Sequence, residues 1–257
     1  MNDRLSFLVG HLIDAVRVNV VSPQTINGEI GWFKRRKIGM DVTIGLGNIF
    51  LKLSRSRIWM FPNCQAWVQW EIHCFHLLYG DRIECHTKGN RGFWVQAMPG
   101  KSLWQWLQEG ELTIAMMEAA GKTFRHAHTR HTNFFPGGWS HGDCHLANVL
   151  YDPKSETAYL IDFETRHWIQ LSTEERQADD LLIFLLDITG RCENWAELLP
   201  IFFQSYNRPL VMRQLKLYLS VPNGWERLLW ATRSNYLSTP QLLSRIAHIR
   251  TQFLSHI

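Results

Sequence analysis

The chain has 257 residues, with 27 Lys and Arg against 23 Asp and Glu, so its formal net charge is +4. Hydrophobic residues make up 46% and charged residues 19% of the chain, which is ordinary globular usage and excludes a disordered or collagen-like protein. A charge this small is not typical of a nucleic-acid-binding protein, and we expect no nucleic-acid partner. The length allows one large domain or two smaller lobes with a substantial core.

Three features favour a cytoplasmic location. The five cysteines are odd in number and form no CxxC pair, so we expect reduced thiols and neither disulfides nor a zinc site. Residues 1–16 are interrupted by His11 and Asp14 and lack a small-residue cleavage site, which argues against a signal peptide. The longest apolar run, residues 181–186, is far too short to cross a bilayer. We therefore predict no stable membrane insertion.

The strongest basic run is Lys-Arg-Arg-Lys at residues 34–37, beside Trp32 and Phe33. A solvated strand edge is the simpler interpretation of this run. The alternative is a contact for phosphate or for an anionic surface, which would allow peripheral membrane contact.

Short β-prone runs dominate the first part of the chain. Residues 41–44 and 49–53 flank a Gly-Leu-Gly-Asn cluster, a pattern typical of a hairpin. A helix is expected over residues 65–79, closed by Gly80. A further β-prone run at 92–97 leads into Met98-Pro99-Gly100, where composition and periodicity change.

Helices are expected to dominate after that point. The first helix is predicted over residues 112–130, and residues 148–162 are typical of a strand, a turn and a strand. Ser172-Thr-Glu-Glu175 matches a capping box before an apolar helix that ends near Gly190. Ser238 opens a final helix whose apolar face would carry positions 242, 246, 249, 253 and 257. We therefore predict an α+β chain with two lobes, residues 1–98 and 99–257.

The residues with the clearest chemistry lie between Trp139 and Asp162. Asn148 begins one predicted strand and Asp162 ends its antiparallel partner, so both side chains return to the same end of the hairpin. Asp143 lies on the loop that enters this end. Two carboxylates and an amide oxygen suit a magnesium ion, with phosphates and water completing its octahedron.

The motif HGDCHLANVL, followed by a hairpin and IDFE, resembles the catalytic core of protein-kinase-like phosphotransferases. It is most similar to the aminoglycoside phosphotransferase and choline/thiamine kinase branch. The resemblance implies a two-lobed fold with a small strand-rich N-lobe, a helical C-lobe, and ATP and Mg²⁺ as cofactors. It also implies that Asp143 is the catalytic base or orients the acceptor hydroxyl, that Asn148 and Asp162 hold the metal, and that His141 supports the loop.

A lysine and a glutamate are expected upstream of this core. Lys52 lies in the otherwise apolar stretch Ile-Phe-Leu-Lys-Leu, and Glu71 shares a helix face with Trp67, Cys74 and Leu78. A carboxylate on an apolar face needs a partner, because an unpaired buried charge is costly. The resemblance therefore indicates a Lys52–Glu71 pair that positions the α- and β-phosphates; the alternative is two unrelated side chains.

The linker between the lobes is predicted at residues 96–103. Gln96 and Met98 lie in it, and its backbone edges could hydrogen-bond the adenine of ATP. No GxGxxG motif precedes Lys52, so the segment that covers the phosphates is left open.

The residues after Asp162 argue against a protein kinase with a peptide substrate. Only residues 165–178 separate IDFE from Asp179-Asp180, which leaves no room for the platform on which protein kinases seat a peptide. Gly142 has no guanidinium that could clamp a phosphorylated loop. Asp179 or Asp180 would either anchor the catalytic loop through backbone N–H groups or be exposed acids of a first helical turn.

Two nearby features are given ordinary roles. His126, His128 and His131 follow one another in steps of two and three residues, which place them on different helix faces. We expect a solvated helix end there and no metal site. Cys144 is expected to be a small filler.

The predicted function is an ATP-dependent phosphotransferase that moves the γ-phosphate to a hydroxyl of a small-molecule acceptor. One alternative is a kinase for a sugar of a lipid-linked or cell-envelope glycan, and another is a non-catalytic binding module with the same fold. The acceptor itself is left open, because residues after Asp180 contain no chemical motif.

Overall fold

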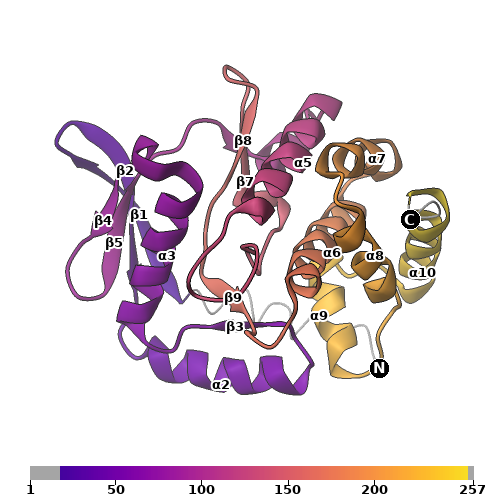
Figure 1. Cartoon of the computed structure of the whole chain (residues 1–257), viewed down its shortest axis with the longest axis horizontal. Helices are drawn as coiled ribbons and strands as arrows, with labels where there is room; N and C mark the ends of the chain where they lie inside the picture. The colour runs from indigo at the N-terminus through magenta and orange to yellow at the C-terminus, as the bar shows by residue number, and fades with distance from the viewer. Residues whose placement is uncertain (1–17, 254–257) are drawn as a thin grey trace.

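The computed structural model describes residues 18–253 (Figure 1). The expectation that residues 1–16 are no signal peptide, and position 257 of the final helix, lie outside the described residues. Within residues 18–253, no helix is both long and apolar enough to cross a membrane.

The first part of the described chain is built on a four-stranded antiparallel sheet with strand order β1-β2-β5-β4. Helix α3 packs against this sheet (Figure 1), and the ring centroids of Trp67 and Phe93 lie 5.7 Å apart across the contact. The Asn63 side chain caps the start of α3, and Gly80, with a φ of 59°, ends it as predicted. The elements are β1 (Asn19–Ile26), β2 (Glu29–Arg36), α2 (Met40–Leu53), β3 (Ile58–Met60), α3 (Cys64–Tyr79), η1 (Gly80–Arg82), β4 (Cys85–Thr87) and β5 (Gly92–Gln96).

The predicted hairpin at residues 41–53 is wrong, because these residues form the helix α2. Their β-branched residues and glycines suggested two strands around a turn. Tertiary contacts override that local preference: the Asn48 side chain bonds both backbone groups of Met60, at 2.7 and 2.8 Å, and Ile44 is buried. Helix α2 therefore lies along one edge of the molecule (Figure 1).

The second part of the described chain is mainly helical. The capping boxes at Ser172 and Ser238 are both present, and each opens the helix predicted for it. The buried helix α6 lies at the centre, and the rings of Phe124, Phe184 and Phe202 from α5, α6 and α7 pack within 5.3 Å of one another. The elements are β6 (Lys101–Ser102), α4 (Leu103–Gln108), α5 (Ile114–Thr129), η2 (Leu146–Asn148), β7 (Val149–Asp152), β8 (Thr157–Leu160), β9 (Thr165–His167), α6 (Thr173–Arg191), α7 (Trp195–Tyr206), α8 (Pro209–Tyr218), α9 (Trp225–Arg233), α10 (Thr239–His248) and η3 (Ile249–Phe253).

The strand pair that positions the site is the antiparallel hairpin β7–β8, as predicted for residues 148–162. Val149 is paired with Leu160, and the Ile161 N–H donates to the Asn148 carbonyl at 3.0 Å. Asn148 and Asp162 therefore lie at the same end of the hairpin. The strand-rich first part and helical second part are confirmed, while the boundary at residues 98 and 99 stays a prediction.

Candidate active site

His141 ties the loop of residues 141–148, predicted to be catalytic, to the segment that leads into Asp162. Its Nδ1 accepts the Asp143 N–H at 3.2 Å, and its Nε2 lies 2.9 Å from the Ile161 carbonyl, to which it donates. Burial lowers the pKa of His141, against the pull of neighbouring acids such as Asp180. The ring is therefore neutral at physiological pH, which this pair of bonds requires.

Asp180 anchors the same loop from α6. Its two carboxylate oxygens accept the backbone N–H groups of His141 and Gly142, at 2.8 and 2.7 Å. Asp179 instead pairs with Arg57 at 3.1 Å. Both carboxylates are buried, so of the two alternatives the exposed-acid interpretation is wrong and loop anchoring by Asp180 is observed.

Gly142 is required by the conformation of this loop. Its φ is +91°, in the region that favours glycine. A Cβ at this position would lie 2.6 Å from Oγ1 of Thr165 in β9. The loop therefore approaches β9 too closely for any side chain here.

His128 orients Asp180, a role that the sequence reasoning missed. Its Nε2 lies 3.1 Å from Oδ2 of Asp180, and its Nδ1 lies 2.8 Å from the Tyr206 hydroxyl. The expected solvated helix end is wrong for this residue, which is fully buried. The missed signal is helical phase, since His128 follows the buried residues Gly121 and Phe124 by seven and four positions.

Asp143 is a partly exposed carboxylate on the loop. Its side chain is 41% exposed, and its Oδ2 lies 3.7 Å from Nε2 of His145. Its backbone carbonyl accepts a hydrogen bond from Nδ2 of Asn148 at 2.9 Å. That bond occupies the amide nitrogen of Asn148, so the amide oxygen is the atom left to face a cation.

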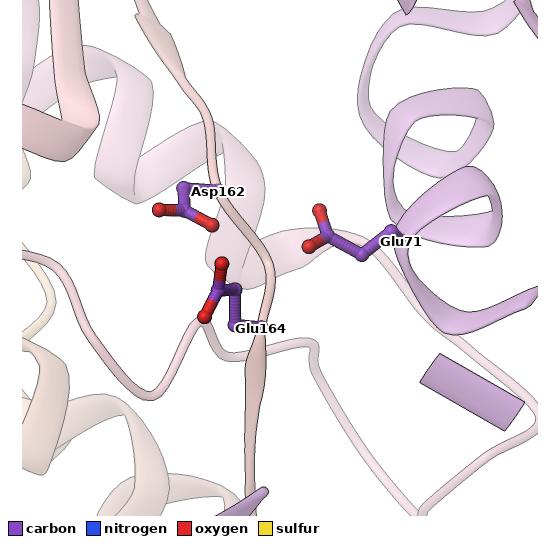
Figure 2. Close-up of side chains that lie close together, drawn as sticks. All are labelled: Glu71, Asp162 and Glu164. Carbon is purple, nitrogen blue, oxygen red and sulfur yellow. The ribbon is translucent and has the colours of Figure 1, made fainter. Parts of the chain in front are cut away.

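Three carboxylates converge beside this loop (Figure 2). Glu71 comes from α3, whereas Asp162 and Glu164 follow β8, and one oxygen of each lies within 4.8 Å of the others. The Glu71 Oε2 also accepts the Phe163 N–H at 3.0 Å. Helix α3 is thereby fastened to the segment that carries Asp162.

Lys34 of β2, and not Lys52, is the partner of Glu71. Its Nζ lies 2.7 Å from Glu71 and 2.8 Å from Glu164, and it also contacts Asp162. Lys52 is exposed on α2. The predicted Lys52–Glu71 pair is therefore wrong, because the stretch around Lys52 is helical.

The interpretation of residues 34–37 as a solvated edge is wrong for two of the four. Lys34 and Arg36 are buried, whereas Arg35 and Lys37 are exposed. Arg36 donates to the Phe61 carbonyl at 2.6 Å. The alternation of side chains along the strand would have indicated this pattern, since side chains two residues apart share one face of a sheet.

Electrostatics at the carboxylate cluster favour binding of a further cation. Burial alone would lower the pKa of Lys34, but Asp162, Glu71 and Glu164 together raise it well above its usual value. Burial and the two neighbouring carboxylates raise the pKa of Glu71 to about 7, although Lys34 opposes this shift. Lys34 is the cation that faces all three carboxyl groups, and hard oxygen donors of this kind suit Mg²⁺. Asp162 belongs to this cluster, and the free amide oxygen of Asn148 at the same end of the hairpin is a donor of the same kind, so both residues suit the predicted metal chemically.

An apolar cavity of about 290 Å³ adjoins the carboxylate cluster. Both predicted linker residues, Gln96 and Met98, line it. The Gln96 N–H is already bonded to the Glu84 carbonyl at 2.8 Å. No hydrogen bond of the Met98 N–H is found within residues 18–253, so this cavity-lining residue has a backbone donor available for a ligand. The other lining residues are Val21, Trp32, Lys34, Glu71, Phe75, Phe93, Val95, Leu150, Ile161 and Asp162.

Comparison with known proteins supports these features. Residues 96–200 match the model of the lipopolysaccharide kinase (Kdo/WaaP) family, a stretch that contains the catalytic loop and the β7–β8 hairpin. Over these residues the chain is similar to a kinase family, in line with the expected phosphotransferase. No curated protein matches the chain significantly.

Solved structures with similar folds include three kinase-related or ligand-bound proteins. An ethanolamine kinase of Plasmodium vivax is 11% identical, with a TM-score of 0.46 over 98% of this chain and 90% of that one. The bifunctional kinase-methyltransferase WbdD is 15% identical, with a TM-score of 0.42 over 86% and 45%. Rv3197 of Mycobacterium tuberculosis, solved with erythromycin, is 10% identical, with a TM-score of 0.41 over 93% and 75%.

Proposed function

We propose that this protein transfers the γ-phosphate of ATP to a hydroxyl of a sugar in a lipid-linked or cell-envelope glycan. The observation that carries the phosphotransfer is the convergence of Lys34, Glu71 and Asp162 beside the loop that presents Asp143. The sugar acceptor is supported by the match of residues 96–200 to the lipopolysaccharide kinase family. This choice takes up the alternative left open by the sequence.

In this proposal the adenine occupies the apolar cavity, and the Met98 N–H donates to it. Lys34, held by Glu71, contacts the oxygens of the α- and β-phosphates. Mg²⁺, when bound through Asn148 and Asp162, would neutralise charge on the phosphates. Catalysis in such a site depends on positioning and on charge stabilisation.

Asp143 would accept the proton of the acceptor hydroxyl as its oxygen attacks the γ-phosphorus and ADP leaves. Its exposure leaves room for a hydroxyl within hydrogen-bond reach. The loop holds it in place, because Asp180 binds the N–H groups of the two preceding residues. His141 holds the loop and His128 holds Asp180, and neither histidine needs to exchange a proton.

The test uses γ-labelled ATP, Mg²⁺ and a fractionated cell extract, with wild type compared to Asp143→Asn. Glu118→Gln, which removes an exposed carboxylate of α5, is the matched control. We expect label in the lipid or glycan fraction, reduced about 10²–10⁴-fold by Asp143→Asn and unchanged by Glu118→Gln. Label only among soluble small molecules would replace the sugar acceptor with a metabolite. Equal labelling by wild type and Asp143→Asn would contradict the catalytic role of Asp143.

A further inference from the structure

Helix α2 has an apolar face that no element within residues 18–253 covers. Val42, Leu46, Ile49 and Leu53 are 72%, 64%, 58% and 70% exposed. Their spacing of four, three and four residues places them in one stripe along the helix. We call these four residues the α2 apolar face.

The orientation of this face is set from the opposite side of the helix. Ile44 is buried beneath α2, and the Asn48 side chain makes two hydrogen bonds to the backbone of Met60 in β3. Both inward residues lie about half a turn from the apolar stripe. The packing of Ile44 and the hydrogen bonds of Asn48 therefore hold the apolar stripe on the outward side of α2.

Exposed apolar residues of helices α8 and α9 lie near the C-terminal end of α2. Trp225 at the start of α9 is 60% exposed, and its ring packs edge-on against Phe50 of α2 with centroids 5.8 Å apart. Leu217 of α8 is 72% exposed and lines the same hollow as Leu53 and Trp225. Residues from both parts of the chain thus contribute to this surface. Figure 1 shows α2 and α9 next to each other.

Cationic side chains flank this surface. Lys37 precedes α2, Lys52 lies in its last turn, and Arg55 follows it; all three are exposed. Of the acids nearby, Asp41 is paired with two arginines at 3.5 and 3.3 Å. Glu226 lines the hollow and is half-buried. The exposed charge around the α2 apolar face is therefore mainly positive.

We propose that the α2 apolar face, with Trp225 and the flanking cations, is a peripheral docking surface for an anionic lipid bilayer. A helix that lies flat in the interface buries apolar side chains at the acyl boundary and keeps cations at the headgroups. Tryptophan favours the same depth, because its ring is apolar and its N–H is polar.

This inference goes beyond the proposed function and does not depend on phosphotransfer. It also differs from the sequence-based alternative that residues 34–37 together contact an anionic surface, because Lys34 and Arg36 are buried. The lipid contact is assigned to α2 and its flanks, in a chain whose described residues contain no helix able to span a membrane.

The experiment is co-sedimentation with vesicles of phosphatidylcholine containing phosphatidylglycerol, and with phosphatidylcholine vesicles alone. We expect wild type to bind the anionic vesicles and to be released by salt. Leu46→Glu/Ile49→Glu should reduce binding more than about tenfold. Lys52→Ala should reduce it about fivefold, the effect of one cation near an anionic surface.

The matched control is Ile114→Glu/Leu243→Glu, which places two carboxylates on exposed apolar positions of α5 and α10. It should bind vesicles like wild type, and circular dichroism should show that each variant is folded. Asp143→Asn should also bind like wild type, so loss of activity and loss of docking are separate results.

Two outcomes would overturn the proposal. The first is equal vesicle binding, or no vesicle binding, by wild type and Leu46→Glu/Ile49→Glu. The second is a wild-type dimer in sedimentation velocity that this double substitution converts to a monomer. In that case a second copy of the chain covers the α2 apolar face.

Discussion

Lys34 of β2 and Glu71 of α3 form a buried ion pair, with Nζ and Oε1 2.7 Å apart. The second oxygen of Glu71 accepts the N–H of Phe163, the residue after Asp162. The pair therefore links the sheet, the helix and the segment that carries the proposed metal ligand. A substitution of Lys34 should therefore disturb the sheet, helix α3 and the segment that carries Asp162.

We expect Lys34→Met and Lys52→Met to have different effects. Lys34→Met leaves the Glu71 carboxylate buried without its ammonium, which should lower the free energy of unfolding by about 3–5 kcal/mol. It should also raise the KM for ATP, because the proposed phosphate contact is lost. Lys52→Met should change neither, since Lys52 is exposed. Urea unfolding and steady-state kinetics measure the two effects.

The double variant Lys34→Met/Glu71→Gln separates stability from function. It removes the buried carboxylate together with its partner, so part of the lost stability should return while ATP use stays impaired. An equal effect of Lys34→Met and Lys52→Met on ATP use would refute the assignment of Lys34.

Asp162→Asn should remove the dependence of nucleotide binding on Mg²⁺. The substitution replaces a carboxylate with a neutral amide, a poorer ligand for this ion. Asp152→Asn is the control, because Asp152 lies at the turn end of the same hairpin and bonds Ser155 at 2.7 Å. Isothermal titration with ADP, with and without Mg²⁺, reports the result. A Mg²⁺ effect as large as that of wild type in Asp162→Asn would remove Asp162 from the metal site.

Asp180→Ala should lower kcat about 10²-fold with little change in the KM for ATP. Two backbone N–H groups lose their acceptor, and a displacement of about 1 Å in a positioned group costs about this much. Asp180→Asn keeps one carbonyl acceptor and should have an intermediate kcat. If both variants lose stability while the remaining folded protein keeps the wild-type kcat, Asp180 does not position Asp143.

Acid should destabilise the protein through His128. Burial lowers the pKa of His128 in the folded chain, against the pull of Asp180. The unfolded chain, with an ordinary pKa of about 6.5, therefore binds a proton that the folded chain resists. The stabilising contribution is complete above pH about 6.5 and is lost as the pH falls through that value toward the lowered pKa.

The measurement is the free energy of unfolding in urea between pH 7.5 and 5.5. The decrease should be smaller in His128→Gln than in wild type, because the titrating group is gone. His126→Gln, at an exposed position two residues earlier, should keep the wild-type slope. A His128→Gln slope identical to that of wild type would assign the acid sensitivity to other groups.

The sequence alone determined the parts of this protein that depend on neighbouring residues. The catalytic loop from His141 to Asn148, the hairpin to Asp162 and the cap at Ser172 each lie within a short stretch. The hydrogen bonds of the hairpin and of the cap connect residues close along the chain, so the spacing of residue types is sufficient to predict them. The motif also predicts the loop, although its anchor Asp180 lies 39 residues after His141. The same reasoning correctly required a partner for Glu71, because a buried charge cannot stay unpaired.

Only the tertiary structure decided which lysine is that partner. Lys34 reaches Glu71 because β2 pairs with β1 and β5, and this register turns its side chain toward α3. Lys52 is excluded because contacts of Asn48 with Met60 hold its segment as a helix. His128 likewise acquired its role from Asp180, 52 residues away. Such choices depend on long-range packing, whose energy outweighs local preference and leaves little trace in the spacing of residues.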